Sequence, residues 1–191
     1  MALGGLVLFP GAGSGADHPS LLAIESAVSP LPVRRVDFVY RRAGRRFPDR
    51  APKLIVEVAA AVEAAAERWN TEPSSLVIGG RSMGGRMASM AIAEGAVEAA
   101  GLVLVSYPLH PPGKPDRLRV EHLGDVGVPT LFVSGNRDTF GTPDELAAAH
   151  ELVGGPVTVE WIEGGRHELK RKADNADVAG RIAGWLDRLR R

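Results

Sequence analysis

The stretch LVIGGRSMGGRMASM, residues 76–90, decides the fold. It opens with a short apolar run, Leu76 to Gly79, of the kind found in buried strands, and the residues after Ser82 have the apolar spacing of a helix. Gly80 and Gly84 stand two residues to either side of the serine. The stretch therefore predicts a strand that turns sharply into a helix, with one hydroxyl at the turn.

The rest of the chain repeats this alternation of strand and helix. Apolar runs predict strands buried on both faces at Leu3 to Phe9, Val33 to Tyr40, Leu76 to Gly79, Gly101 to Ser106, Pro129 to Ser134 and Val157 to Trp161. Helical spacing covers Leu54 to Trp69 and, roughly, Met83 to Ala93, Pro143 to Val153 and Asn175 to Leu189. We therefore predict one α/β domain over residues 1–191, with a mostly parallel sheet of about six strands and helices on both faces.

Composition narrows the class of protein and of site. The 191 residues are 45% apolar, which suits one globular domain with a sizeable core. The 23 basic side chains balance 23 acidic ones, so we expect no nucleic-acid partner and no membrane partner. The chain has no cysteine, which excludes a thiol nucleophile, and it has no HExxH-like histidine pair, so no metal site is expected. The chain start is not typical of a signal peptide, and a cytoplasmic location is the expectation.

Ser82 lies in the pentapeptide GRSMG, which fits the pattern GxSxG. At a strand-to-helix turn this pattern is typical of a nucleophile elbow, where the serine takes a strained backbone conformation and exposes its hydroxyl. Neighbours two residues away then have no room for side chains, which explains Gly80 and Gly84. The amide N–H of Met83 is placed to stabilise a developing oxyanion. The alternative is a glycine-rich turn with an incidental serine.

A serine hydroxyl needs a base to take its proton and a third group to orient that base. Asp138 follows the fifth predicted strand in LFVSGNRDTFG, and His167 follows the sixth in WIEGGRHEL. In a parallel sheet these loops leave the same edge as Ser82, where ligands bind. We therefore predict Asp138 and His167 as the partners of Ser82. His110, in the loop YPLHPPGKP after the fourth strand, is the alternative base.

These motifs together resemble those of a known family. GGRSMGGR, with Asp138 in GNRD and His167 in GGRHEL, resembles the α/β-hydrolase superfamily. More narrowly, PGAGSG, GGRSMGGRMAS and SYPLHPPGKPDRLRVEHL followed by PTLFVSGNRDTFG are similar to the small dienelactone-hydrolase-like group that includes testis-expressed protein thirty. The resemblance covers nearly the whole chain. It implies a triad of Ser82, Asp138 and His167.

The chain also departs from that group. Dienelactone hydrolases proper use a cysteine nucleophile, so their substrate is not carried over. The first-strand loop of many relatives reads HGAG, whereas this chain has PGAG at residues 10–13. The amide of Ala12 still fits a second oxyanion donor. The longest stretch without a predicted element, Tyr107 to Val128, is too short for a large lid and is expected to form only a rim.

Arginines gather around the end of the second predicted strand: Arg34, Arg35, Arg41, Arg42, Arg45, Arg46 and Arg50. They are either a solvated loop or a site that recognises a carboxylate or phosphate on the substrate. Arg81, inside the elbow, raises the same question. Arg81 is a candidate substrate contact for this reason. His110 is a second candidate, because its loop follows the fourth predicted strand.

Three hypotheses follow from different classes of protein. The leading one is a serine hydrolase that needs no cofactor and cleaves a small ester, thioester or related acyl compound. The second is a dinucleotide-binding protein, since Gly11, Gly13 and Ala16 fit GxGxxA after the first strand. That hypothesis leaves the elbow unexplained. The third is a hydrolase fold that serves only as a binding module.

Overall fold

Six parallel strands form one sheet. The computed structural model describes residues 2–111, 113–169 and 171–191. The strands lie in the order β2-β1-β3-β4-β5-β6, and each neighbouring pair is parallel. Their bounds are Gly5–Phe9 for β1, Val33–Arg35 for β2, Leu76–Arg81 for β3, Gly101–Val105 for β4, Thr130–Gly135 for β5 and Val157–Ile162 for β6. The predicted α/β class and parallel sheet are confirmed.

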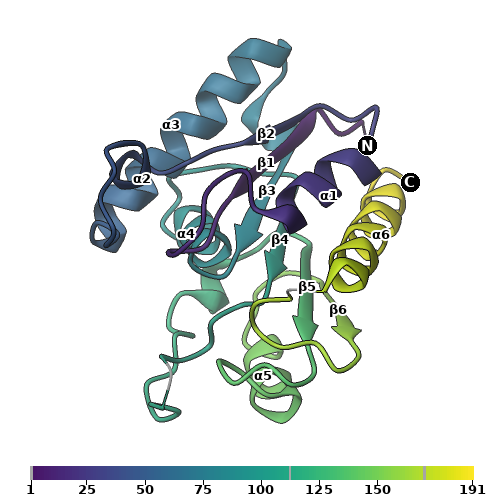
Figure 1. Cartoon of the computed structure of the whole chain (residues 1–191). Helices are drawn as coiled ribbons and strands as arrows, with labels where there is room; N and C mark the ends of the chain where they lie inside the picture. The colour runs from purple at the N-terminus through teal and green to yellow at the C-terminus, as the bar shows by residue number, and fades with distance from the viewer. Residues whose placement is uncertain (1, 112, 170) are drawn as a thin grey trace.

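Helices cover both faces of the sheet, as predicted (Figure 1). Helices α1 (Pro19–Ala27) and α6 (Lys172–Leu189) pack on one face. Helices α3 (Ala51–Trp69), α4 (Met83–Ala93) and α5 (Pro143–His150) pack on the other. Strand β1 shows why both faces are apolar, because Leu6 and Leu8 join the core under α1 and α6, whereas Val7 and Phe9 join the opposite core. Short turns complete the connections: α2 (Val39–Arg42) and the 3₁₀ turns Pro73–Ser75 and Leu123–Asp125.

The second strand differs from its prediction. The apolar run Val33 to Tyr40 was expected to be one strand, but β2 ends at Arg35 and residues 39–42 form α2. Phe38 and Tyr40 are nevertheless buried, and the Phe38 ring stacks on that of Phe9 with ring centroids 5.5 Å apart. The apolar run therefore predicted the burial of these residues correctly, but the prediction of one continuous strand was wrong. A buried aromatic side chain fits a helical turn as well as a strand.

The two edge strands also differ from the expectation that every strand is buried on both faces. All residues of β2 are only half-buried, and so are the first five of β6. Both strands have a neighbour on one side only, which leaves their outer sides accessible. The four inner strands are fully buried, as predicted.

The carboxyl ends of the strands meet at one edge of the sheet. In the register, Phe9 pairs with Gly80, Arg81 with Val105, and Gly135 with Ile162. The loops that follow β1, β3, β5 and β6 therefore leave the same edge, which is where parallel sheets bind ligands. Within the described parts of the chain, no helix combines the length and apolar character needed to cross a membrane.

Candidate active site

Ser82 occupies the turn between β3 and α4. Its backbone has φ 50° and ψ −119°, a conformation that a residue with a side chain rarely adopts. The turn is held by its own backbone, since the Ser82 amide donates to the carbonyl of Val105 at 2.8 Å and its carbonyl accepts from the Arg86 amide at 3.1 Å. The hydroxyl caps no helix amide. Oγ is therefore available for other contacts, and such strain is typical of functional sites.

Steric crowding explains why residues 80 and 84 are glycines. A Cβ atom on Gly80 would lie 2.1 Å from the carbonyl oxygen of Phe9, and one on Gly84 would lie 2.3 Å from the same atom. The end of β1 thus packs directly against both sides of the turn. The prediction that these positions have no room for side chains is confirmed, and the group they would strike is the β1 backbone.

We expect Gly84→Ala to destabilise the protein, because backbone atoms on both sides of the contact cannot move apart cheaply. The free energy of unfolding should fall by about 3 kcal/mol or more, at the upper end for overpacked sites. Chemical denaturation measures it. Gly180→Ala is the matched control: Gly180 lies exposed within α6 with no atom near its Cβ position. It should stabilise the helix by about 0.5–1 kcal/mol. Equal stabilities of Gly84→Ala and wild type would contradict this account of the turn.

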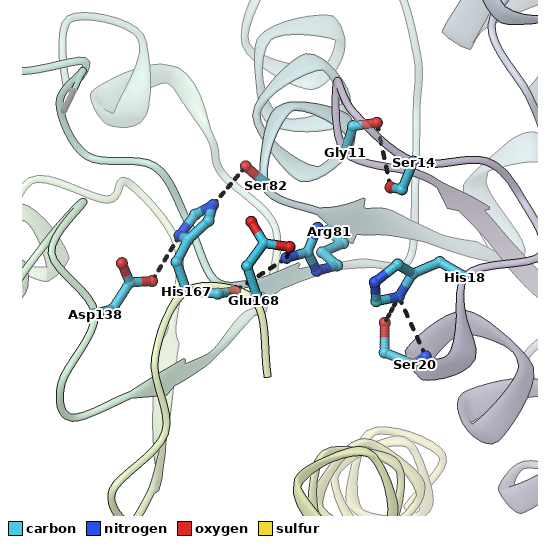
Figure 2. A network of polar contacts seen from close by, with 9 residues as sticks. All are labelled: Gly11, Ser14, His18, Ser20, Arg81, Ser82, Asp138, His167 and Glu168. Carbon is cyan, nitrogen blue, oxygen red and sulfur yellow. Dashed lines mark hydrogen bonds and ion pairs between the residues drawn. The ribbon is translucent and has the colours of Figure 1, made fainter. Parts of the chain in front are cut away.

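His167 connects Ser82 to Asp138 (Figure 2). Its Nε2 lies 2.9 Å from Ser82 Oγ, and its Nδ1 lies 2.8 Å from Asp138 Oδ2. The His167 residue is 7% exposed and Asp138 only 2%. When Nδ1 carries the proton and donates to the carboxylate, Nε2 is left to accept the hydroxyl proton of Ser82. The structure thus brings together the three side chains that were selected from the sequence.

The imidazole and its carboxylate are held from several sides. Asp138 Oδ1 accepts the amide N–H of Phe140 at 2.8 Å, so both carboxylate oxygens are engaged. The Phe140 ring stacks on the His167 ring with centroids 3.9 Å apart. The amide of Arg137 donates to Gly165 O at 2.9 Å and joins the two loops. Sequence reasoning missed Phe140, because nothing in its pattern distinguishes it from another loop residue.

Arg81 lies behind the His167 loop. Its side chain is 4% exposed, and Nη2 donates to the His167 carbonyl at 3.1 Å and to Glu168 Oε2 at 2.8 Å (Figure 2). It does not line the cavity that contains Ser82. This placement does not support the predicted substrate contact, because the guanidinium is turned to the loop. It instead ties the loop that carries His167 to the end of β3.

His110 does not line the cavity either. It is buried, with Nε2 at 3.6 Å from Glu145 Oε1 and Nδ1 at 3.0 Å from the carbonyl of Pro111. It is not among the residues that line the cavity beside Ser82. The structure therefore gives no support for a substrate contact by His110, and it is His167 that reaches the hydroxyl.

A cavity of about 330 Å³ opens beside Ser82. Ala12 and Met83, whose amides were predicted as oxyanion donors, both line it. A hydrogen bond fixes the loop after β1, since the Tyr40 hydroxyl donates to the carbonyl of Ala12 at 2.9 Å. The polar lining otherwise comes from Asp49, Arg86 and Arg119.

Neither cavity arginine was selected from the sequence. Arg86 had a readable signal, because it follows Ser82 by one helical turn and so lies on the same side of α4. Arg119 had none, since it belongs to an irregular segment. The arginine group predicted around the end of β2 does not line this cavity. Five of its members are exposed: Arg41, Arg42, Arg45, Arg46 and Arg50.

A six-stranded parallel sheet with a strained serine between β3 and α4 defines an α/β-hydrolase architecture. Residues 4–186 match the family described as "Alpha/beta hydrolase domain". The chain belongs to this family, and the resemblance to the superfamily is confirmed.

Solved structures share this fold. Est1E from Butyrivibrio proteoclasticus superposes with a TM-score of 0.77 at 13% identity, covering 98% of this chain and 88% of that chain. The RedJ thioesterase of the prodiginine pathway in Streptomyces coelicolor gives 0.71 at 16% identity, covering 96% and 91%. The dienelactone hydrolase from Anabaena variabilis gives 0.69 at 20% identity, covering 98% and 87%. At these identities the likeness shows a common fold.

Proposed function

We propose that this protein is a serine hydrolase that cleaves a small ester, thioester or related acyl compound. The observation that supports it most is the unbroken line of hydrogen bonds from Ser82 through His167 to Asp138. In the proposed reaction Ser82 Oγ attacks the acyl carbonyl carbon while His167 Nε2 takes the hydroxyl proton. His167 then protonates the leaving group. Water, activated by the same imidazole, releases the acyl group from Ser82.

The negative charge that develops on the carbonyl oxygen needs fixed donors. We assign this role to the amides of Met83, at the N-terminus of α4, and Ala12, in the loop after β1. Both residues border the cavity beside Ser82, and a helix N-terminus favours a negative charge. No cofactor enters these steps, since the nucleophile, base and donors all come from the chain.

The neighbours' names agree with acyl chemistry, because they include a thioesterase and a dienelactone hydrolase. Within the family, we place the chain in the small dienelactone-hydrolase-like group that includes testis-expressed protein thirty. The motifs around Ser82, Asp138 and His167 support that placement. Serine stands here where dienelactone hydrolases proper have cysteine, so an oxygen ester intermediate replaces a thioester one.

Short acyl chains should be the better substrates. The cavity has a volume of about 330 Å³, and its rim from residues 107–128 contributes Pro108 and Arg119. Methylenes beyond that volume stay in water and gain none of the roughly 0.8 kcal/mol that burial of each would supply. With 4-nitrophenyl esters from acetate to decanoate, kcat/KM should peak at short chains and then level off or fall. A steady rise to the longest ester would contradict the small cavity, and no hydrolysis of any ester would count against the proposed function.

A further inference from the structure

Two arginines line the cavity next to Ser82, and the proposed reaction uses neither. Arg86 projects from α4 one turn after Ser82, and Arg119 comes from the segment after β4. Burial, and next the positive charge of Arg86, lower the pKa of Arg119, so the two guanidinium groups repel each other. Two cations that repel each other in a partly buried cavity destabilise the empty site. A bound anion would relieve this repulsion.

No acidic side chain neutralises these arginines in the described parts of the chain. Neither Arg86 nor Arg119 forms an ion pair there. Among the residues that the structure describes, the buried Nε of Arg86 has no hydrogen-bond acceptor, and the Nη1 of Arg119 donates to the neutral carbonyl of Pro108 at 3.2 Å. A guanidinium normally finds a carboxylate or phosphate when it is partly buried. Both residues line the cavity, and neither guanidinium group has an acidic partner among the described residues.

The other charged groups nearby do not change this balance. Asp49 lines the same cavity, but its carboxylate is taken by Arg45 at 2.7 Å and Lys53 at 3.0 Å. His122 is kept neutral, because burial and the charge of Arg86 lower its pKa to about 4. The cavity wall beside the nucleophile is therefore positive at neutral pH.

Arg119 is also held in place before any ligand arrives. Its amide donates to Leu109 O at 2.8 Å, and its carbonyl accepts the hydroxyl of Tyr107 at 2.6 Å. Tyr107 is itself buried. A guanidinium on such a fixed backbone loses less freedom when it binds, which is the arrangement expected of a recognition residue.

We propose that Arg86 and Arg119 form an anion subsite that selects acyl substrates carrying a carboxylate close to the scissile bond. This inference rests on the proposed hydrolase function. One helical turn separates Arg86 from Ser82, or about 6 Å along the helix. The carboxylate should therefore be separated from the reacting carbonyl by about two or three methylenes or an equivalent length.

Matched ester pairs test the subsite. On the acyl side, mono-4-nitrophenyl succinate and glutarate are compared with the neutral 4-nitrophenyl butyrate and valerate. On the leaving-group side, 3-carboxy-4-nitrophenyl butyrate is compared with 4-nitrophenyl butyrate. The quantity is the ratio of kcat/KM for the anionic ester to that for its neutral partner. Dividing the variant's ratio by the wild-type ratio removes the intrinsic reactivity of each ester.

Arg86→Gln and Arg119→Gln should each lower this ratio about 10- to 100-fold in at least one pair, the usual effect of losing a charge-assisted hydrogen bond. Hydrolysis of the neutral esters should change only a few-fold, which shows that the variants are folded and active. Arg117→Gln is the matched control, because Arg117 is an exposed arginine in the same segment. It should leave the ratio unchanged. The wild-type ratio should also fall as salt is raised, since ions screen the attraction.

A ratio that neither variant changes would overturn the subsite while the proposed hydrolase function survives on the neutral esters. A fall in this ratio in Arg166→Gln, and not in the two cavity variants, would also overturn the subsite. Arg166 lines a different cavity, which His167 borders and Ser82 does not. If no ester of either kind is hydrolysed, the proposed function fails and the subsite fails with it.

Discussion

Ser82→Ala should abolish both the hydrolysis of short esters and covalent labelling by a fluorophosphonate. Such a probe reacts with a serine only when a base and oxyanion donors activate its hydroxyl, so labelling does not require the natural substrate. The hydroxyl 2.9 Å from His167 Nε2 is the one placed for this activation. Loss of the nucleophile in a triad typically costs roughly 10⁴- to 10⁶-fold in kcat.

The base can be assigned in the same experiment. His167→Gln should reduce labelling almost as far as Ser82→Ala, because the members of a triad act as a unit. His110→Gln should leave most of the labelling rate, since His110 faces Glu145. Ser26→Ala is the control for the serine, because Ser26 is exposed on α1. Mass spectrometry locates the label, and its rate compares the variants.

Two results would change the interpretation. A folded wild type that stays unlabelled at neutral pH, while a control hydrolase labels, would favour a non-catalytic binding module on the hydrolase fold. Labelling that depends on His110 and persists without His167 would keep the hydrolase and overturn the assigned base.

The fold was predictable from sequence wherever the hydrophobic pattern is compatible with only one type of secondary structure. The inner strands are short apolar runs between helical stretches, and a parallel sheet is the arrangement that buries them on both faces. The turn at Ser82 was predictable because only glycine fits beside the β1 backbone at Gly80 and Gly84. The run after Val33 was not, because buried aromatics such as Phe38 and Tyr40 are compatible with either a strand or a helical turn.

The residues of the candidate site also fall into two groups, those that the sequence predicts and those that it does not. Ser82, Asp138 and His167 each follow a strand, so sheet topology alone brings their loops to one edge. Their hydrogen-bond contact is seen in the structure, and their catalytic roles stay predictions. Arg81 was a reasonable candidate for a substrate contact from its place in the elbow, but the direction of a side chain depends on packing that a local pattern does not contain. Arg119 depends on the path of an irregular segment, which no periodicity describes.

Asp138→Asn should lower kcat about 10⁴-fold, the effect measured when the same type of orienting aspartate is replaced in a triad protease. The asparagine amide would donate to Nδ1, which forces the imidazole proton onto Nε2. The ring then presents a donor to Ser82 where an acceptor is needed. Because Asp138 itself does not line the cavity, KM should change little.

This substitution separates orientation of the base from support of the fold. The asparagine carbonyl can still accept the Phe140 amide that Asp138 Oδ1 accepts at 2.8 Å, so the free energy of unfolding should change far less than kcat. Asp144→Asn, at an exposed aspartate in the first turn of α5, is the matched control and should leave kcat unchanged. Near wild-type kcat in a folded Asp138→Asn protein would show that His167 needs no carboxylate, because the imidazole would then keep its acceptor toward Ser82 without one.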